Sequence, residues 1–565
     1  MRTRLRMIVI GLALVSTVAI AQRPTRVIGA GEGVAAKTPY MQPQGSTVRL
    51  YKDTTYVLTG FYYVDSTATL IIEPGTVIKG DSATQGTLIV RRGGKIYAEG
   101  TRYAPIVFTS RKAIGQRKRG DWGGVVILGN APTNRPTTQK VEGVDVGGEY
   151  GGSDLDDNSG IFRYVRIEYP GIVISLNNEI NGLTMGGVGR GTTIEYVQVS
   201  YSNDDSFEWF GGTVDARHLI AWGGTDDDFD SDYGYSGRIQ FAFSKRDPNL
   251  WDAAGESNGF ESDNDGTPTY NQPITAPVFS NVTMVGPQSD TTVALPVGNK
   301  FQYAALLRRN VKTSVHNSVL MGYPWGISIR NDSTAAHALD GRLQVRNLSM
   351  QAQANTLAKS SVNITFDPTA WFTTGGWNNL GSTPRQPANI GLVDVFHATA
   401  PDPRPAVGSE ADTATTDFSS TQLDPAFFAS TSYRGAFDPS KARSEQWDYG
   451  WTNYNPQNEL YPIIIGVTDV ADAETQIPES YSLAQNYPNP FNPSTTIRFS
   501  LPNAGKTQLK IYDLLGREVA DLIDEFRNAG THTVTFDASR LATGIYFYKL
   551  TAGNFNQVRK MMLVK

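Results

Sequence analysis

The chain has 565 residues and no cysteine, which excludes disulfides, thiolate metal sites, a cysteine nucleophile and a lipoprotein anchor. Its length exceeds that of one ordinary domain, and its 56 glycines, with almost no helical periodicity, indicate a β-rich protein with many turns. Residues 22–480 hold 37 basic and 49 acidic side chains, and this net charge of −12 argues against nucleic acid as a partner.

Residues 1–21 have the pattern of a secretory signal peptide. Three arginines precede an uncharged apolar run of 14 residues, which is shorter than the roughly 20 that span a bilayer as a helix. Small residues that signal peptidase accepts follow at Ala19 and Ala21. A membrane anchor is the alternative, but nothing later in the chain resembles a transmembrane span. We therefore predict an exported protein, with residues 22–49 as an N-terminal leader.

Residues 50–335 contain repeated units of a strand, a turn rich in Gly, Asn or Asp, and a second short strand. Residues 194–212 and 216–234 align at a spacing of 22, which places Val197 on Leu219 and Phe207 on Phe229. The residues that begin at Phe260 match those that begin at Phe229, at a spacing of 31. Unequal spacing of matching strands is typical of a solenoid, because insertions are confined to its loops. Repeats of 22 and 31 residues that contain only strands and turns predict the coils of a parallel β-helix.

The segment before these repeats supports the same fold. Alternating strands separated by glycine turns occur in TLIIEPGTVIKGD (69–81), GTLIVRRGGKIYAEG (86–100) and GDWGGVVILG (120–129). Together with the repeats, they resemble the coils of right-handed parallel β-helix proteins found among large secreted bacterial proteins. The resemblance implies an all-β solenoid and leaves the activity open, because this fold hosts unrelated functions. A β-propeller or an array of sandwiches is the alternative fold.

Familiar catalytic motifs are missing from the sequence. None of the five histidines belongs to an HExxH pair, and neither GxxxxGK[ST] nor GxSxG occurs. His218, beside a predicted strand, is expected to be structural. No organic cofactor is expected.

A dense group of acidic residues lies within the repeats, at matching positions of successive coils. Its candidate metal ligands are Asp204, Asp205, Asp226, Asp227, Asp228, Asp230, Asp232, Glu261 and Asp263. Stacked coils would bring matching residues to about 4.8 Å, where two carboxylates repel by roughly 1 kcal/mol in water and about 3.5 kcal/mol at an effective dielectric of 20. A hard cation such as Ca²⁺ would relieve this repulsion. Two alternatives remain open: aspartates that only satisfy turn N–H groups, and a catalytic acid pair.

Residues 336–466 are rich in aromatic residues, proline and glycine, and are expected to cover the open end of the solenoid and pack along its side. The alternative is that Trp371, Trp377, Trp447 and Trp451 line a carbohydrate platform.

The C-terminal part follows a polar linker at 467–481. Alternating strands and a proline-rich entry predict a small antiparallel β-sandwich for residues 482–565. Its stretches NYPNPFNP (486–493), DLLGR (513–517) and GIY (544–546) closely resemble the type A C-terminal sorting domain of the type IX secretion system of Bacteroidetes and related bacteria. The matching positions are Asn486, Tyr487, Pro488, Asn489, Pro490, Phe491, Asn492, Pro493, Gly516 and Gly544.

This second resemblance implies partners and a location. It implies contact with the type IX secretion machinery, passage across the outer membrane, usual removal of the domain, and either attachment to surface lipopolysaccharide or release. An ordinary immunoglobulin-like domain that decorates the body is the alternative.

Two classes of function remain open. The first, which we favour, is a non-enzymatic protein of the cell surface or medium that acts in adhesion or binds a glycan or matrix. The second is a calcium-dependent polysaccharide lyase or a glycoside hydrolase. A lyase needs an Arg or Lys base, and few lie near the acids: Arg217, Arg238, Lys245 and Arg246. A hydrolase needs two carboxyls about 5 to 9 Å apart, and Asp204, Asp226 and Asp228 are its candidates.

Overall fold

The computed structural model describes residues 23–461 and 481–565, apart from short gaps at 176–177, 268, 355, 382–385, 487–488, 503–504, 528–529, 540 and 554. The predicted signal peptide, with Ala19 and Ala21, lies outside the described residues. The chain divides into two compact units, residues 1–465 and 466–565. Among the helices of the described residues, none is long and apolar enough to cross a membrane.

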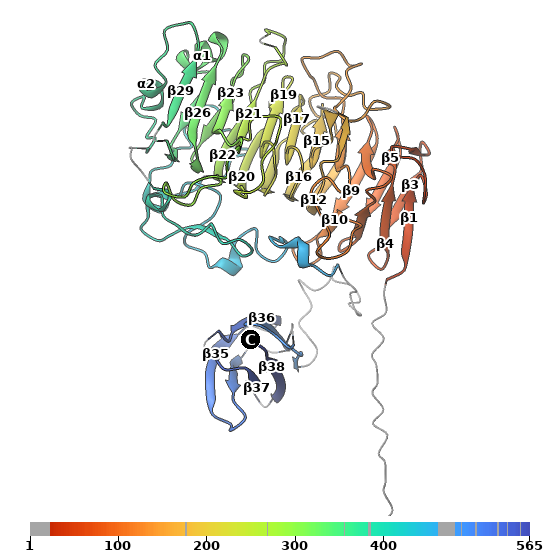
Figure 1. The fold of residues 1–565 in the computed structure, drawn as a ribbon, viewed down its shortest axis with the longest axis vertical. Helices are drawn as coiled ribbons and strands as arrows, with labels where there is room; N and C mark the ends of the chain where they lie inside the picture. Colours follow the sequence, from red (N-terminus) through yellow and green to blue (C-terminus); the bar gives the residue numbers. More distant parts are fainter. Residues whose placement is uncertain are drawn as a thin grey trace, which may run out of the picture. The chain divides into compact units, whose positions relative to one another are not determined.

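The first unit is a parallel β-helix whose coils stack along one axis (Figure 1). One wall is an eleven-stranded parallel sheet, called sheet B here. Its strands, in spatial order, are β2 (Pro39–Gln42), β5 (Phe61–Val64), β8 (Thr87–Val90), β11 (Val125–Leu128), β15 (Leu183–Gly186), β17 (Phe207–Phe210), β19 (Phe229–Asp232), β21 (Phe260–Ser262), β23 (Tyr303–Leu307), β26 (Trp325–Arg330) and β29 (Ala358–Ser361).

The other walls form a sixteen-stranded parallel sheet made of two rows. Row 1 begins with β3 (Thr47–Leu50), β6 (Thr69–Ile72) and β9 (Lys95–Glu99), and row 2 begins with β1 (Thr25–Gly29), β4 (Thr55–Thr59), β7 (Val77–Gly80) and β10 (Ile106–Ser110). Both rows join in the long strands β12 (Gly160–Glu168), β16 (Thr193–Ser200), β18 (Ala216–Trp222), β20 (Arg238–Lys245) and β22 (Val278–Val285). They separate again as β24 (Ser314–His316) and β27 (Val345–Arg346) in row 1, and β25 (Val319–Tyr323) and β28 (Ser349–Ala352) in row 2.

From β12 onwards, one residue in each coil bends the chain from row 1 into row 2, either inside a long strand or between the short strands β24 and β25 or β27 and β28. These residues all have positive φ, between 49° and 61°, and occupy the same register position in successive coils: Tyr164, Tyr196, His218, Phe241, Asn281, Asn317 and Asn347. Asparagine tolerates this left-handed conformation better than most residues, whereas Tyr and Phe are strained in it. The aromatic members compensate by stacking on one another, for example Tyr164 on Tyr196 with ring centroids 4.3 Å apart.

Inward-facing side chains form a continuous core through the coils. Phe207, Phe229 and Phe260 occupy the same register position on β17, β19 and β21, and all three are buried. The ring centroids of Phe207 and Phe229 are 5.6 Å apart, and those of Phe229 and Phe260 are 5.8 Å apart. The predicted parallel coils and their 22- and 31-residue register are therefore confirmed.

The solenoid extends beyond both of its predicted boundaries, residues 50 and 335. The expected leader at 22–49 instead contains β1, β2 and β3, which form the first coil by pairing in parallel with the next one. At the other end, helix α1 (Asp332–Leu339) leads into one more coil, β27 to β29, and helix α2 (Pro368–Phe372) follows. Trp371 and Trp377 are buried against the last coil, so they cover its open end. The strands at both ends are too short to give a clear alternating pattern.

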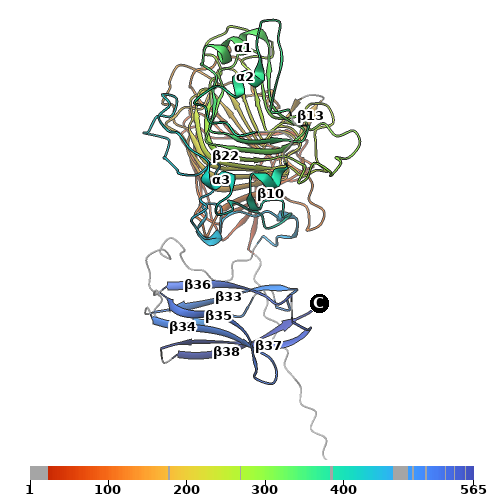
Figure 2. The ribbon, with the colours of Figure 1, turned by 90° about the vertical axis from the view of Figure 1, so that its left-hand side faces the viewer.

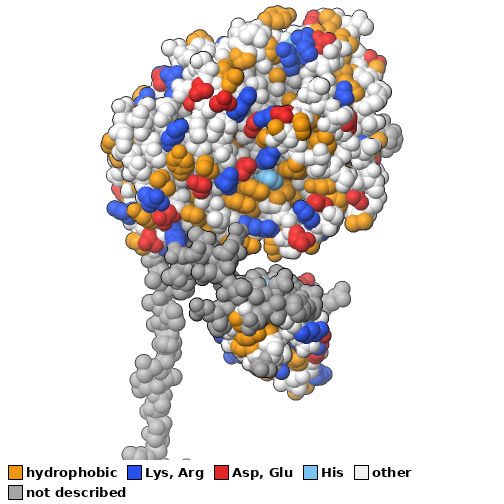
Figure 3. All heavy atoms as spheres, turned by 180° about the vertical axis from the view of Figure 1, so that it is seen from behind, with side chains coloured by type: hydrophobic (Ala, Val, Ile, Leu, Met, Phe, Trp, Pro, Cys, Tyr) orange, Lys and Arg blue, Asp and Glu red, His pale blue; other side chains and the backbone are white. Residues whose placement is uncertain are grey.

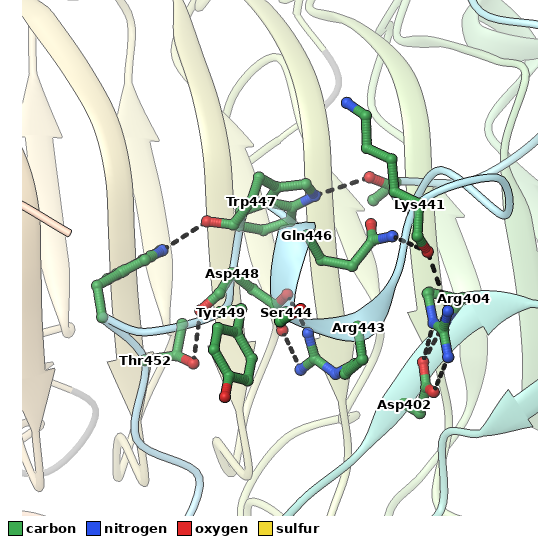
Figure 4. A network of polar contacts seen from close by, with 12 residues as sticks. Asp402, Arg404, Lys441, Arg443, Ser444, Gln446, Trp447, Asp448, Tyr449 and Thr452 are labelled. Atoms are coloured by element: carbon green, nitrogen blue, oxygen red, sulfur yellow. Dashed lines mark hydrogen bonds and ion pairs between the residues drawn. The ribbon is translucent and has the colours of Figure 1, made fainter. Parts of the chain in front are cut away.

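Residues 387–461 form a strap that lies along the side of the solenoid and not over its end (Figure 1). Its apolar residues pack on row 2, and residues 422–429 contact row 1, for example Ala429 with Gln240. The strap contains η1 (Pro387–Asn389), β30 (Leu392–Asp394), β31 (Asp402–Pro405), α3 (Glu410–Thr413), η2 (Arg443–Glu445) and η3 (Pro456–Asn458). Its Phe437 and Trp451 are fully buried against Trp222 and Phe243 of the solenoid. Internal polar contacts such as Arg443 with Asp448 fix its course (Figure 4). Trp371, Trp377 and Trp451 are buried, and Trp447 is half-buried against Phe437, so the four do not form the exposed platform of the alternative.

The second unit is an antiparallel sandwich of two sheets (Figure 2). One sheet has the order β32 (Ser482–Leu483), β33 (Ser494–Leu501), β36 (Gly530–Asp537), and the other has β35 (Glu518–Arg527), β34 (Gly505–Tyr512), β37 (Gly544–Ala552), β38 (Phe555–Leu563). Between them lies a separate core that includes Phe499, Ile511 and Tyr548.

The sorting motif closes this sandwich. Asn486 is buried, and its backbone N–H donates to the Tyr548 hydroxyl at 2.8 Å. The Asn489 side-chain oxygen accepts the N–H of Met562 at 2.8 Å, and the buried Phe491 pairs with the last strand through its N–H and carbonyl. These contacts hold the C-terminal strand in place. Tyr487 and Pro488 lie outside the described residues.

Candidate metal centre

The turns that precede β17, β19 and β21 carry a ladder of side-chain oxygens. Asp205 Oδ1 accepts the N–H of Asp227 at 2.7 Å, and Asp227 Oδ1 accepts the N–H of Asn258 at 2.6 Å. Asn258 Oδ1 in turn accepts the N–H of Tyr303 at 3.1 Å. One oxygen of each aspartate therefore stabilises the next coil, as the turn interpretation predicts, and the other oxygen remains available for a different ligand.

A second ladder of carboxylates stands on the outer face of sheet B. Glu208, Asp230 and Glu261 follow the inward-facing phenylalanines by one residue and pair in register on β17, β19 and β21. Because side chains alternate along a strand, this places all three outside the core, on neighbouring coils. The ladder of predicted acids is therefore real, and it faces the turn aspartates.

The two ladders meet in three groups of carboxylates. In each group the three ligand oxygens lie within 4.8 Å of one another: Asp204 with Asp205 and Asp226, Asp205 with Glu208 and Asp230, and Asp227 with Asp230 and Glu261. Asp205 belongs to the first two groups and Asp230 to the last two. The groups therefore form one continuous row, called the carboxylate row below, and its outer two groups share no residue.

Two cavities open on the carboxylate row. Cavity I, of about 530 Å³, is lined by Asp227 and Glu261 together with Lys300 and Arg308. Cavity II, of about 540 Å³, is lined by Asp204, Glu208 and the loop acids Glu142, Glu179 and Asp252. Both cavities are also lined by Asp205, Asp226 and Asp230. The row is thus reached through two adjoining cavities, which also share Ala254 and Gly255. The face in Figure 3 carries interspersed acidic and basic side chains.

Burial and mutual repulsion raise the pKa of these carboxyls. Loss of hydration is the first cause for every member of the row, and neighbouring carboxylates add to it. The pKa of Asp227 rises to about 8 through burial and then Asp226, although Arg246 and the Asn258 N–H oppose the rise. The pKa of Glu142 rises to about 7, again mainly through burial. Without cations, the row therefore cannot be fully ionised at neutral pH.

Two predicted ligands, Asp228 and Asp263, have arginine partners, and a third, Asp232, lies outside the three groups. Glu261 stays in the row, although it also pairs with Arg308. Asp228 is fully buried; its Oδ1 lies 3.2 Å from Nε of the equally buried Arg246, and its Oδ2 accepts the Tyr323 hydroxyl at 3.0 Å. Asp263 accepts Nε of Arg308 at 2.9 Å and pairs with Arg309. Asp228, Asp232 and Asp263 lie in the same sequence repeat as the acids of the row, but ion pairs with arginines neutralise Asp228 and Asp263.

A comparison with models of protein families identifies the family of the first unit. Residues 43–384 match the model of a pectate-lyase-like β-helix domain. The chain belongs to this family. Residues 485–565 match the secretion-system C-terminal sorting domain, which shows a secreted or outer-surface protein handled by the type IX machinery. A search of curated proteins found no match.

The β-helix domain also contributes residues that the sequence did not single out. Asn181 is almost fully buried in cavity II, and its Nδ2 donates to Glu208 Oε2. Its Oδ1 is buried without a hydrogen-bond partner in the described structure. Glu142 comes from the loop between β11 and β12, and Glu179 ends the hairpin β13 (Val173–Ser175) and β14 (Asn178–Glu179). The N–H of Glu179 donates to Glu142 Oε1, which joins the loop to the hairpin. The loop that carries Glu142 lies about 60 residues before the acids and is not part of the sequence repeat. Only the tertiary fold brings it to the carboxylate row.

Proposed function

We propose that this secreted β-helix protein binds calcium in the carboxylate row and uses the bound ions to hold an acidic glycan at the cell surface, without catalysis. The observation that supports it best is the row itself: seven carboxylates in three linked groups, open to two cavities. Repulsion among them needs a counter-charge, and the two arginines beside them are already paired, Arg246 with Asp228 and Arg308 with Glu261 and Asp263.

The donors fit calcium. All are carboxylate or amide oxygens, and Ca²⁺ accepts six to eight such ligands in flexible geometry. Because the outer two groups share no residue, the row has room for two ions, one near Asp204 and one near Glu261. The unpartnered Oδ1 of Asn181 adds a neutral ligand beside Glu208. Zinc fits poorly, since cysteine is absent and His218 lies in the bend ladder under the strap.

A glycan can reach the row through a neighbouring cavity. Cavity III, of about 560 Å³, shares Arg119 and Asn203 with cavity II and is lined by Tyr169 and Tyr201, whose rings stack 5.5 Å apart. The Tyr169 hydroxyl is buried without a hydrogen-bond partner in the described structure. Hydroxyl and guanidinium donors beside bound calcium suit a sugar chain that carries carboxylates.

The state of the basic residues favours binding without catalysis. Arg308, which lines cavity I, is held by Glu261 and Asp263, and both acids raise its pKa. Arg246 is buried with Asp228. Neither guanidinium can accept a proton from a substrate, because each stays charged.

Lys300 is the observation that supports the second candidate, a uronate lyase. It is exposed and lines cavity I beside Asp227 and Glu261. In this alternative, the Lys300 amine would remove the proton at C5 of a calcium-bound uronate. The C–H electron pair would form the C4–C5 double bond, and the glycosidic oxygen would leave C4 and take up a proton.

One experiment tests the proposal and separates the two candidates. The mature chain is incubated with polygalacturonate and with alginate, with 5 mM calcium or with EDTA (about five- to fifty-fold above a dissociation constant on the order of 10⁻⁴ to 10⁻³ M). Binding is measured by co-sedimentation, and cleavage by the ultraviolet absorbance of unsaturated ends. We expect calcium-dependent binding, lost in Asp226→Asn/Asp230→Asn, and no new absorbance. Absorbance that appears with wild type and disappears in Lys300→Ala would establish the lyase instead, and no binding to either polymer would contradict both candidates.

A further inference from the structure

The turn between β34 and β35 presents two leucines to solvent. The side chains of Leu514 and Leu515 are 66% and 78% exposed. Asp513 fixes the turn around them: its Oδ1 accepts the N–H groups of Leu515 and Arg517, each at 2.9 Å, and its Oδ2 accepts Arg517 Nε at 2.8 Å. The leucines are therefore held outward by a closed hydrogen-bonded turn.

The same side of the sheet continues this apolar surface. Tyr512 on β34 pairs with Phe547 on β37, and Lys549 pairs with Val558 on β38, so their side chains share the face opposite the core. A cavity of about 410 Å³ is lined by Leu514 and by these four residues. Val558 is 54% exposed. We call the surface formed by Tyr512, Leu514, Leu515, Phe547, Lys549 and Val558 the Leu514 face.

Two lysines place positive charge at the face, whereas a third, Lys510, which lies opposite Lys549 in register, is neutralised by Glu518 and Asp521. Lys560 stands next to Phe547 in register, and Lys549 lies within the face itself. Residues 481–565 hold 10 basic and 6 acidic side chains, in contrast to the acidic body. A partner for this surface therefore needs apolar side chains surrounded by carboxylates.

Part of the NYPNPFNP motif cannot be read directly by a receptor, although Asn489, Pro490, Asn492 and Pro493 are exposed. Asn486 and Phe491 are each only 2% exposed and serve to close the sandwich. Recognition must use what the closed sandwich displays, and among the described residues of this unit, Leu514 and Leu515 are the most exposed large apolar side chains.

We propose that the Leu514 face is the surface by which the sorting domain docks on a protein of the type IX machinery, through an apolar pocket with an acidic rim. The inference rests on the sorting domain and is independent of the calcium site.

The test uses the full chain, expressed in a bacterium that has this secretion system. Leu514→Gln/Leu515→Gln should reduce the amount at the surface and in the medium at least tenfold, with the chain retained in the periplasm. Lys549→Glu/Lys560→Glu should do the same through charge. Arg498→Glu, on the exposed side of β33 in the other sheet, is the matched control and should be exported normally.

Folding is checked separately by the thermal melt of each purified chain, and the exposed leucines should leave it unchanged. If the leucine variant nevertheless melts early, the lysine variant decides alone. Normal export of a folded variant of either kind would overturn the proposal. Normal export with loss of self-association in sedimentation would also overturn it, since the face would then join two copies of this chain.

Discussion

The rings of Tyr196 and His218 stack with centroids 4.2 Å apart and planes only 3° from parallel. Both residues have positive φ at the same position in neighbouring coils, and Trp451 and Trp447 of the strap contact them. The bend that turns row 1 into row 2 thus also provides the aromatic surface on which the strap rests.

His218 makes the attachment of the strap sensitive to acid. Burial lowers its pKa to about 3 from an ordinary 6.5, with a smaller effect from Arg217. The folded chain therefore keeps His218 neutral while the unfolded chain takes up a proton, so stability falls as pH drops below 6.5 towards 3. At pH 5 this amounts to about 2 kcal/mol, from 1.36 kcal/mol per pH unit. His218→Phe should lose this part of the acid dependence in denaturant melts, and an unchanged dependence would contradict the assignment.

The phenylalanine stack predicts a large cost for truncation. Phe229→Ala removes the middle ring between Phe207 and Phe260 and should lower the free energy of unfolding by about 3 to 5 kcal/mol. Phe229→Leu, as a control, should cost much less because most of the volume is kept. A shift below 1 kcal/mol for the alanine variant in urea melts would mean that the coils do not pack as described.

Asp228 should behave as a structural residue and not as a metal ligand. Asp228→Asn leaves the buried Arg246 without its counter-charge, which should cost about 3 to 5 kcal/mol. The variant should retain the calcium response of the wild type. Loss of calcium binding in a folded Asp228→Asn chain would move Asp228 into the metal site.

The raised pKa values predict opposite pH dependences with and without calcium. In EDTA, the carboxyls of the row bind protons more tightly when folded than when unfolded, so stability should fall as pH rises from about 4, the unfolded pKa, through about 8, the folded value for Asp227. Calcium needs the ionised forms, so its stabilisation should grow over the same range. Thermal melts at pH 5 and pH 7.5 in both media test this, and parallel curves would exclude a bound cation.

The sequence predicted the solenoid because its strands repeat in phase, as the alignment of Phe207 with Phe229 shows. It did not predict the first coil, since β1 to β3 lie among polar loops with little alternation. The acids of the row were predicted from the same phase. The position in the repeat could not distinguish Asp230 from Asp228. Asp230 faces the cavities, whereas Asp228 is neutralised by Arg246, which follows another strand. Asn181 and Glu142 were missed for the same reason: they reach the row through tertiary contacts only.

Calorimetric titration of the mature chain with calcium tests the central claim most directly. We predict saturable binding of two ions per chain, with dissociation constants on the order of 10⁻⁴ to 10⁻³ M. At ten times that concentration, each ion should stabilise the fold by about 1.4 kcal/mol. Asp226→Asn/Asp230→Asn should abolish the heat signal, while Asp394→Asn, an exposed strap residue outside the row, should leave it unchanged. A flat titration of the wild-type chain would contradict the account and leave the aspartates as turn residues.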